Sequence, residues 1–380
     1  MKHTNFKYIF AVLGLAASLG YGFVPTSIAQ ASYRFADFEG RPPLHIFKAA
    51  QTAASGVTPA EIKKIYNLPS TGGTGTIAII DAYDDPTIES DLAAFDKQFG
   101  LVACTTKNGC FEKHTMAAST TKDAGWSMEI SLDVEWAHAI APKAKILLVE
   151  AKTPSGANLV SAIDYARGRK DVVAISMSWG GAEFSDELSY DSHLVPKANP
   201  VTTFFASSGD DGTGASWPAS SPDVIGVGGT SLKLTSKGTL SSETAWAGSG
   251  GGVSAYEKEP AYQASYNIPK ANGMRAIPDV AYDADPASGY PIYYSGPQPA
   301  NTADWYVVGG TSAGAPQWAA IRALGTVTLA KIYTDKASTS TLKYFRDITS
   351  GSNGTCSYYC DARKRYDYVT GVGTPQTDKF

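Results

Sequence analysis

One ten-residue stretch has the composition of a turn that carries a nucleophile. Residues 307–316 read VVGGTSAGAP, so two valines run into two glycines, Thr311, Ser312 and small residues before Pro316. We expect a strand that enters a tight turn and opens a helix, which would expose the Ser312 hydroxyl for attack on a carbonyl. A serine is a weak nucleophile and needs a base to accept its proton. Such a base must lie elsewhere in the chain.

Histidine, the usual base of serine hydrolases, is poorly placed in this sequence. None of the five histidines stands in the helix-opening context of a Ser-His-Asp hydrolase. The HExxH pattern of zinc peptidases is absent. The glycine-rich segment 70–76 precedes a strand-like run instead of following one, so it is not expected to bind phosphate. We therefore expect a base other than histidine.

Two acids four residues apart, Glu129 and Asp133, offer that base. In a helix they lie about 40° apart on one face, and apolar residues share their half of the helical wheel. The other half holds Ser131, Glu135 and His138, so that half is expected to face solvent. A solvated pair is the ordinary interpretation of two such acids. Carboxylates that are close together and partly out of water do not both ionise readily, so one pKa rises and that group can act as a general base.

The surrounding sequence indicates a single α/β domain. Apolar strands separated by helices favour a parallel sheet covered on both faces. Residues 214–305 are rich in Gly, Ser and Pro and are expected to form short strands and long loops on that sheet. The expected strands are 76–83, 145–151, 172–179 and 201–208, and the expected helices are 88–99, 129–141 and 157–168.

A third acid, Asp210, follows the strand-like run VTTFF in the segment ASSGDDG. Sites on parallel sheets gather at the carboxyl ends of the strands. Asp210 is therefore a candidate site residue, although an acid beside Gly209 is equally compatible with an ordinary turn.

Residues 1–31 are expected to form a signal peptide. Lys2 and Lys7 precede an apolar run from Tyr8 to Leu19, and residues 29–31 supply small side chains for signal peptidase. The apolar run is short for a spanning helix, and later segments do not reach membrane length. We expect a secreted protein, extracellular or periplasmic, that has no membrane association after the signal is removed.

Charge and cysteine spacing limit the partners. The net charge is −4, or −6 without residues 1–31, and there is no basic tract, so nucleic-acid binding is not expected. Cys104 and Cys110 are close in sequence, as are Cys356 and Cys360, and each pair is expected to close a local disulfide loop. A four-thiolate zinc site is the alternative, disfavoured by the long gap between the pairs. We expect a monomer.

The chain as a whole resembles the sedolisins, serine-carboxyl peptidases with a subtilisin-like fold. The resemblance runs from TPAEIKKIYNLP (58–69) to TGVGTP (370–375), and it implies a peptidase domain over residues 58–380. The segments that carry it include EISLDVEWAHAIAPKAKI, SMSWGGAE, ASSGDDG, ETAWAGSGGGVS, IPDVAYDADPASGY and GGTSAGAP.

The resemblance implies a role for each matched residue. It makes Ser312 the nucleophile, Glu129 the base, Asp133 the group that orients the base, and Asp210 a residue that lines the oxyanion hole. The family usually has GDSG where this chain has GDDG, and the extra charge of Asp211 should raise the Asp210 pKa if the two are close.

Two further residues match positions that extend the hydrogen-bond chain behind the base in some sedolisins. These are Asp81 and Trp179. A strand-end turn acid and a packed core indole are equally compatible with the sequence.

The implied mechanism passes through an acyl-enzyme on Ser312, with Glu129 accepting the proton and later returning it to the leaving amine. Asp210 can donate to the oxyanion only while it is protonated. Activity is therefore expected in acid and should fade toward neutral pH.

The resemblance also implies one calcium ion (Ca²⁺) near the C-terminus, bound by two aspartates and by backbone carbonyls. Arginines replace two glycines of the family pattern, which removes a permissive backbone and brings two cations toward the ion. Carbonyl ligands survive a change of side chain, so calcium stays expected. The matching residues are Asp347, Ile348, Arg363, Arg365 and Asp367.

Three functions are compatible with these patterns. A secreted endopeptidase acting on protein or peptide substrates is preferred, and a tripeptidyl-type exopeptidase is the alternative. An inactive binding homologue is less favoured because all four catalytic side chains are present. Residues 32–57 are expected to form a short N-terminal arm, far smaller than the usual sedolisin prosegment, so we expect a protein that either folds unaided and is exported active or is held inactive by neutral pH alone.

Overall fold

The computed structural model describes residues 33–50, 56–117, 121–297, 304–334 and 343–377. The predicted signal peptide, residues 1–31, lies outside the described residues. Within the described part of the chain, no helix combines the length and apolarity needed to cross a membrane.

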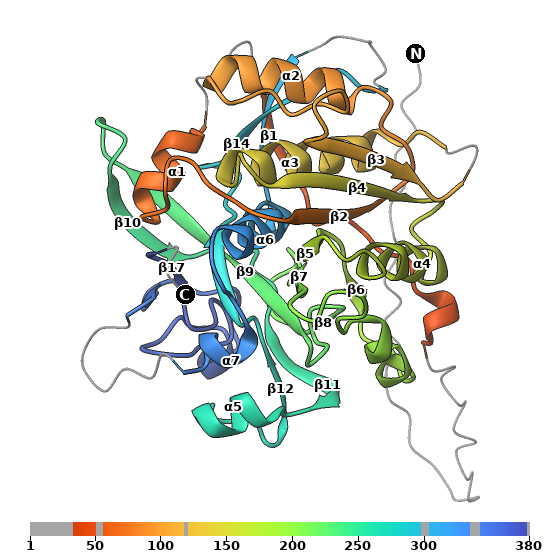
Figure 1. The fold of residues 1–380 in the computed structure, drawn as a ribbon. Coiled ribbons are helices and arrows are strands. Elements are labelled where there is room, and N and C mark those ends of the chain that lie inside the picture. The colour runs from red at the N-terminus through yellow and green to blue at the C-terminus, as the bar shows by residue number, and fades with distance from the viewer. Residues whose placement is uncertain (1–32, 51–55, 118–120, 298–303, 335–342, 378–380) are drawn as a thin grey trace, which may run out of the picture. The chain divides into compact units, whose positions relative to one another are not determined.

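An eight-stranded sheet forms the centre of the unit Tyr33–Phe380 (Figure 1). Its neighbouring strands are parallel apart from an antiparallel pair at one edge, which confirms the predicted subtilisin-like, mostly parallel α/β architecture. In spatial order the strands are β10 (Leu240–Ala245), β9 (Val224–Leu234), β7 (Thr203–Ser207), β5 (Val172–Met177), β2 (Thr76–Ala82), β4 (Lys145–Ala151) and β3 (Phe111–Thr115), and β13 (Val280–Asp283) pairs with β9.

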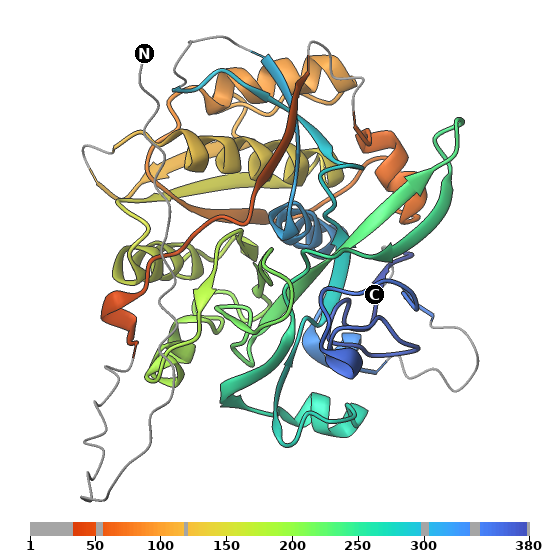
Figure 2. The same ribbon diagram turned by 180° about the vertical axis from the view of Figure 1, so that it is seen from behind.

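Helices cover both faces of this sheet (Figures 1 and 2). Alternate residues of β2 show the division, because Ile79 belongs to the core on one face and Ile80 to the core on the other. The Ile79 face is covered by α3 (Ala124–Ile140) and α6 (Gly314–Leu324), with α2 (Ile88–Phe99) packed on α3, and the Ile80 face is covered by α4 (Gly156–Arg167).

Smaller elements complete the described unit. An antiparallel sheet joins β1 (His45–Ala50), β15 (Asp304–Gly309) and β14 (Tyr290–Tyr294). Two-stranded pairs are β11 (Gly252–Lys258) with β12 (Met274–Ile277), β6 (Gly181–Ala182) with β8 (Ser216–Trp217), and β16 (Phe345–Arg346) with β17 (Thr374–Pro375). The remaining helices are α1 (Pro59–Ile65), α5 (Ala261–Tyr266), α7 (Leu329–Ile332), and the 3₁₀ turns η1 (Phe35–Asp37), η2 (Glu187–His193), η3 (Thr311–Ala313) and η4 (Ser357–Tyr359).

The interpretation of residues 214–305 as loops and short strands on the sheet was partly wrong. Strand β9 is eleven residues long and, with β13, belongs to the central sheet. Its glycines serve close packing: a Cβ on Gly228 would collide with Pro278 and with the Val369 carbonyl. High glycine content here reflects crowding of the backbone and not a loop.

The solvated face predicted for α3 was also wrong. Residues from Trp126 to Ile140 are all buried, and Glu135 and His138 are 0% exposed. Elements packed outside α3 supply their partners: Glu135 accepts the Tyr293 N–H at 3.1 Å, and His138 Nε2 lies 2.8 Å from the Val102 carbonyl. A helical wheel uses only the sequence of the helix, so it cannot show that other segments of the chain pack over its polar half.

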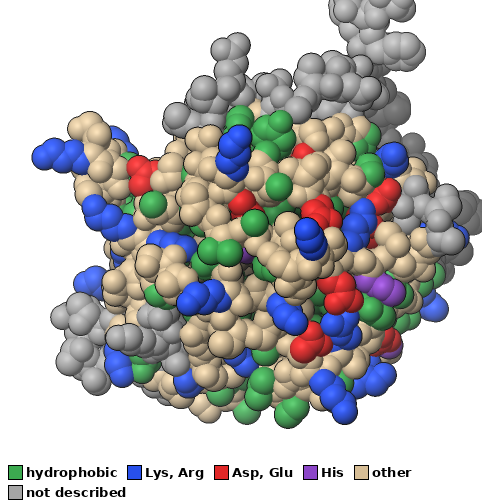
Figure 3. All heavy atoms as spheres, turned by 45° about the horizontal axis from the view of Figure 1, so that its top comes forward, with side chains coloured by type: hydrophobic (Ala, Val, Ile, Leu, Met, Phe, Trp, Pro, Cys, Tyr) green, Lys and Arg blue, Asp and Glu red, His purple; other side chains and the backbone are tan. Residues whose placement is uncertain are grey.

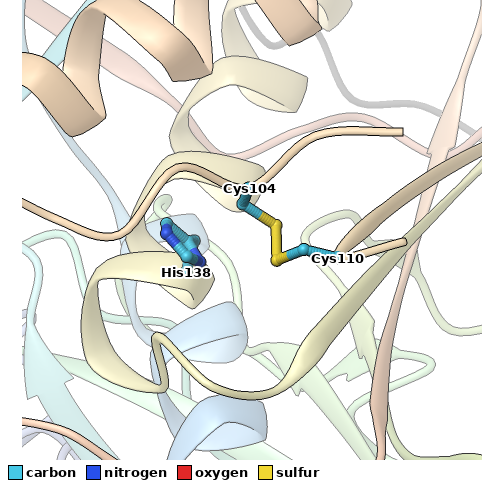
Figure 4. Close-up of side chains that lie close together, drawn as sticks. All are labelled: Cys104, Cys110 and His138. Atoms are coloured by element: carbon cyan, nitrogen blue, oxygen red, sulfur yellow. A yellow bond between two sulfur atoms is a disulfide. The ribbon is translucent and has the colours of Figure 1, made fainter. Parts of the chain in front are cut away.

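Both predicted disulfides are confirmed, Cys104–Cys110 and Cys356–Cys360. Figure 4 shows His138 beside the first of them, a grouping that has the residue types of a metal site. The sulfurs are bonded to each other, so they offer no thiolate ligands, and the zinc alternative is wrong for these cysteines.

Charged side chains of both signs are interspersed on the face shown in Figure 3. Hydrophobic side chains on this face are scattered among them. Among the described residues, the N-terminal arm contributes exposed apolar side chains at Ile46 and Phe47, each 52% exposed.

Candidate active site

The site lies where the strand order of the central sheet reverses. The chain runs from β2 to the edge strand β3, returns to β4 between them, and then crosses through α4 to β5 on the other side of β2. Carboxyl ends of strands beside such a reversal form a crevice that folds of this kind use for binding and catalysis. Asp81 lies at the end of β2, and Ser178 directly follows β5.

Three acids meet in this region, and all three are 0% exposed: Asp81, Glu129 and Asp133. Burial is the largest cause of their raised pKa values, and the charge of Asp81 raises the pKa of both Glu129 and Asp133 further. Placing Glu129 and Asp133 at i and i+4 of a buried helix therefore produces the coupled pair that the sequence predicted.

Ser312 lies in the η3 turn between β15 and α6, which confirms the predicted strand, turn and helix. Gly310 enters the turn at φ 120°, and a Cβ there would collide with the Pro43 carbonyl and the Asp210 carboxylate. Ser312 is close enough to Glu129 to lower the Glu129 pKa. Among the described residues, however, neither Ser312 Oγ nor the two Glu129 carboxylate oxygens have a partner in hydrogen-bond geometry.

The predicted exposure of the Ser312 hydroxyl is wrong, because Ser312 is 0% exposed. The N-terminal arm lies against the segment just before it, with His45 paired to Gly309. Arg41 and Gly180 exchange two backbone hydrogen bonds of 3.0 and 3.1 Å. Figure 2 shows the arm, in red, running along the blue β15 strand.

Asp210 connects this turn to the carboxyl end of β7. Its Oδ1 accepts hydrogen bonds from the Thr311 N–H and hydroxyl, both 2.8 Å, and its Oδ2 lies 3.1 Å from His45 Nε2. Burial raises the Asp210 pKa, while His45 and Thr311 oppose that shift. These groups have the largest effects on Asp210, whereas the exposed Asp211 raises the pKa of His45.

A cavity beside this turn is shared by the arm and the sheet. Its lining includes Arg41, Pro43 and Leu44 from the arm and Gly180 and Asp210 from the sheet ends. Its volume is about 780 Å³. The arm therefore occupies one wall of the space next to the candidate oxyanion residue.

The structure brings Trp179 near the acids without bonding it to them. The indole Nε1 donates to the Ile80 carbonyl at 2.8 Å, so the packed-core interpretation holds for this tryptophan. The neighbouring Ser178 makes the connection instead. Its hydroxyl donates to Asp133 Oδ1 at 2.8 Å and lies 3.2 Å from the Ser312 carbonyl.

The two C-terminal acids come from different segments, Asp347 after β16 and Asp367 later in the chain, and both accept backbone N–H groups from residues 363–365. Arg365 N–H lies 3.0 and 2.9 Å from the two Asp347 carboxylate oxygens, and Arg363 N–H donates to Asp367 Oδ2 at 2.9 Å. Arg365 adopts φ 69°, so the left-handed backbone expected of glycine persists with an arginine. The Arg363 guanidinium bonds Asp361 at 3.0 Å and lies over the Tyr358 ring.

Sequence reasoning missed three groups near the site: Ser178, His45, and the pair Lys113–Glu150. Glu150 ends the buried run KILLVEA, and an acid at the carboxyl end of a central strand was a usable signal. His45 lies in an arm whose sequence carries no indication of pairing with β15.

Comparisons with known proteins agree with this fold. Residues 113–345 match the subtilase family. Sedolisin from Pseudomonas sp. (strain 101) is 28% identical over 86% of this chain and 61% of its own length, and kumamolisin from Bacillus sp. (strain MN-32) is 29% identical over 86% and 63%. Tripeptidyl-peptidase 1 of Dictyostelium discoideum is 27% identical over 87% of this chain and 59% of its own length.

A solved structure of Pseudomonas sedolisin, described as a serine-carboxyl proteinase, superposes with a TM-score of 0.71 at 28% identity and covers 86% of this chain and 96% of that one. The chain spans about three fifths of the length of the curated relatives it matches. These findings confirm the resemblance to sedolisins that the sequence motifs indicated. The family match extends over more than half of the sequence, and the chain belongs to the subtilase family.

Proposed function

We propose that this protein is a secreted serine-carboxyl endopeptidase that hydrolyses peptide bonds in acid. The observation that carries the proposal is the meeting of Glu129, Asp133, Asp210 and Ser312 from three separate segments at one end of the sheet. The secreted location rests on the signal-like residues 1–31. The peptidase relatives of the chain support the reaction class.

In the proposed reaction, Glu129 accepts the Ser312 proton as Oγ attacks the scissile carbonyl. Asp133 shares the charge and the proton of this pair and is itself held by the Ser178 hydroxyl. Protonated Glu129 then donates to the leaving amine, and water reverses the steps to release the acyl group. The dry surroundings strengthen each of these charge interactions.

Asp210 is proposed to stabilise the negative oxygen of the intermediate as a protonated donor. A single well-placed donor at such an oxygen contributes on the order of 2.7–4 kcal/mol. Burial favours the protonated form by raising the Asp210 pKa, and ionisation would replace a donor by a repelling charge. The sign follows directly: activity is present below the Asp210 pKa and is lost as the pH rises through it.

Substrate must take the place of part of the arm in this proposal. The Gly180 backbone is engaged by Arg41, and Asp210 by His45. An extended peptide can use the same Gly180 groups in antiparallel fashion. Tripeptidyl-type cleavage is the second candidate, favoured by the similarity to tripeptidyl-peptidase 1.

A calcium ion is proposed for Asp347, Asp367 and the loop of residues 363–367, whose carboxylate and carbonyl oxygens are of the kind that a hard cation prefers; the ion would replace backbone N–H groups that these carboxylates accept in the described structure. Asp347 and Asp367 supply carboxylate oxygens, and Ile348, Arg363 and Arg365 would supply backbone carbonyls. The Arg363 guanidinium is turned toward Asp361 and Tyr358, which lessens the conflict of charge expected from the sequence. The ion would tie the C-terminal loop together and would take no part in the chemistry.

The deciding experiment is degradation of a denatured protein at low pH by wild type and Ser312→Ala. The matched control is Ser131→Ala, which removes another buried hydroxyl that has no hydrogen-bond partner among the described residues. We expect Ser312→Ala to lose activity and Ser131→Ala to keep it. Equal rates for Ser312→Ala and wild type would reject the function, and the size of the released peptides separates endopeptidase from tripeptidyl cleavage.

A further inference from the structure

A hydroxyl that takes no part in the proposed proton transfers joins the acid pair to the nucleophile turn. Ser178 directly follows β5, and its Oγ lies 2.8 Å from Asp133 Oδ1 and 3.2 Å from the Ser312 carbonyl oxygen. All three residues are 0% exposed. A serine hydroxyl carries one proton, so these two buried oxygens compete for it.

The distances favour Asp133 as the acceptor of this proton. Asp133 Oδ1 lies at the ordinary distance of an O–H···O hydrogen bond, whereas the Ser312 carbonyl lies slightly beyond it. A carboxyl oxygen that accepts a hydrogen bond is the poorer place for a proton of its own. A protonated Asp133 therefore carries its proton on Oδ2.

The oxygens between the two acids are the ones that need a proton. Among the described residues, Asp133 Oδ2 and both Glu129 carboxylate oxygens have no partner in hydrogen-bond geometry. The two side chains are close enough for a hydrogen bond from Asp133 to lower the Glu129 pKa, against the larger effect of burial. An ionised carboxylate that is buried without a donor is costly. A proton on Asp133 Oδ2 would supply that donor to Glu129.

The pair holds one proton in the form that can react. Burial is the largest cause of the raised Asp133 pKa, followed by the charges of Asp81 and Glu129. Two close buried carboxyls lose their protons in separate steps, and between these steps one proton remains. In that state Glu129 can accept the Ser312 proton. The charged groups that face the pair or its neighbours are Asp81 of β2, Glu150 beside it on β4, and Asp210 beyond β7.

We propose that Ser178 is a positioning residue that holds the remaining proton of this pair on Asp133 Oδ2, between the two acids, by donating to Asp133 Oδ1. The inference rests on the proposed function. From Oδ2 the proton is donated to the Glu129 carboxylate, which stays ionised and able to accept the Ser312 proton. A proton on Oδ1 would face Ser178 instead and leave the buried Glu129 charge without this donor.

The test is the pH profile of kcat/KM in Ser178→Ala. Without the hydroxyl the proton loses its preference for Oδ2, ionised Glu129 is less stabilised, and the acid limb moves to higher pH. We expect an upward shift of about one pH unit and a fall in kcat on the order of tenfold, the equivalent of one buried hydrogen bond. KM should stay close to the wild-type value, because the Gly180 backbone proposed to bind substrate is unchanged.

The direction of the shift separates the two ways of placing the protons. If Asp133 donates from Oδ1 to Ser178, and Ser178 donates to the Ser312 carbonyl, the hydroxyl draws the proton away from Glu129. Removing it would then move the acid limb to lower pH. A downward shift in Ser178→Ala would overturn the proposal.

A matched control lies two residues earlier on β5. Ser176 is 0% exposed, and its hydroxyl has no hydrogen-bond partner among the described residues. Ser176→Ala removes the same kind of group and should leave the profile in place. If Ser178→Ala also leaves the acid limb unmoved and changes only the melting temperature, Ser178 is structural and the proposal is wrong.

An Asp133→Asn background separates proton placement from packing. An asparagine has its donor on one atom and its acceptor on the other, so its amide nitrogen can donate to the Glu129 carboxylate without help from Ser178. Adding Ser178→Ala to Asp133→Asn should therefore move the acid limb far less than Ser178→Ala does alone. A full shift in this background would overturn the proposal.

A measurement that needs no turnover keeps this outcome distinct from failure of the proposed function. Infrared difference spectra of Ser312→Ala follow the C=O stretch of the protonated Asp133 carboxyl, identified by its loss in Asp133→Asn. A hydrogen bond accepted by Oδ1 lowers that frequency, so adding Ser178→Ala should raise it. An unchanged frequency would overturn the proposal even if Ser312 proved essential.

Discussion

Two groups of buried acids in this molecule differ in how their oxygens are satisfied. Asp367 accepts backbone N–H groups from Arg363, Val369 and Thr370, and its pKa is raised only to about 7 although it is buried. In the described structure, Glu129 has no hydrogen-bond partner on either oxygen, and burial raises its pKa well above the ordinary value. Donors hold the first carboxylate in place, whereas the second keeps its lone pairs available for a proton.

The difference separates acids that hold structure from acids that do chemistry. A saturated carboxylate fixes a loop, and each N–H donor offsets part of the cost of burying its charge, because each N–H favours the ionised form. An unsatisfied buried carboxylate destabilises the fold when it ionises. Such a group persists at catalytic sites because a poised proton acceptor is useful there.

The largest expected effect is on activity, in Glu129→Gln. The amide cannot accept the Ser312 proton, so we expect kcat/KM to fall on the order of 10⁴-fold, as for the loss of other triad members. Stability should move the other way. The Glu129 pKa is higher in the folded state than its ordinary 4.5, so wild type loses stability relative to the variant as the pH rises above about 4.5.

Thermal melts at several pH values, measured beside the rates, test both halves of this prediction. Activity within tenfold of wild type would remove Glu129 from the role of base. A melting temperature lowered at every pH would show that the unsatisfied carboxylate stabilises the fold. That result would contradict the distinction between hydrogen-bonded acids that hold structure and unsatisfied acids that do chemistry.

The next effect concerns pH dependence, in Asp210→Asn. An asparagine donates at every pH, so the decline of the rate toward neutral pH should disappear, with a lower maximal rate because the amide is a weaker donor. His45→Ala should shift the decline to higher pH, since His45 lowers the Asp210 pKa. Rate profiles from acidic to neutral pH check both variants. A decline that is the same in all three proteins would assign it to another group.

Asp367 belongs to the acids whose oxygens are hydrogen-bonded, so Asp367→Asn should lower the free energy of unfolding more than it lowers activity. The amide nitrogen cannot accept the Arg363 N–H, and an unpaired buried donor costs about 1–3 kcal/mol. That loss should lower the melting temperature by a few degrees. Activity measured well below the transition should fall far less than in Glu129→Gln. A greater loss of activity than of stability would place Asp367 with the catalytic acids.

The smallest expected effect is that of calcium removal. A ligand at one hundred times its Kd stabilises the folded state by about 2.7 kcal/mol. Chelation should therefore lower the melting temperature by a few degrees, and added Ca²⁺ should restore it. Asp347→Asn should lose this response. A chelator that leaves the wild-type melting temperature unchanged would contradict the proposed calcium site.

Local sequence patterns predicted elements that are decided within their own segment. Helix α2 has the predicted bounds because its amphipathic run ends at Gly100, which takes the left-handed conformation that stops a helix. Helix α3 starts at Ala124, five residues before the predicted start, because Asp123 caps it through the Trp126 N–H. The sequence contains this cap, but the predicted helix begins at Glu129, the first residue of the acid pair, and so starts too late.

Features that depend on distant contacts could not be predicted from local patterns. The burial of Glu135 and His138 requires β14 and α2 to pack over α3. The burial of Ser312 and the ion pair of His45 with Asp210 depend on the arm pairing with β15, some 260 residues away. The candidate catalytic residues were nevertheless named in advance, because family resemblance carries tertiary information that periodicity lacks.

The most direct test of the account is mass spectrometry of enzyme quenched in acid during turnover of a peptide substrate. The proposed mechanism predicts an acyl adduct on Ser312, within the peptide that contains residues 307–316, and a far slower adduct in Glu129→Gln. An adduct on another residue, or one that forms on Ser312 at the same rate in Glu129→Gln, would contradict it.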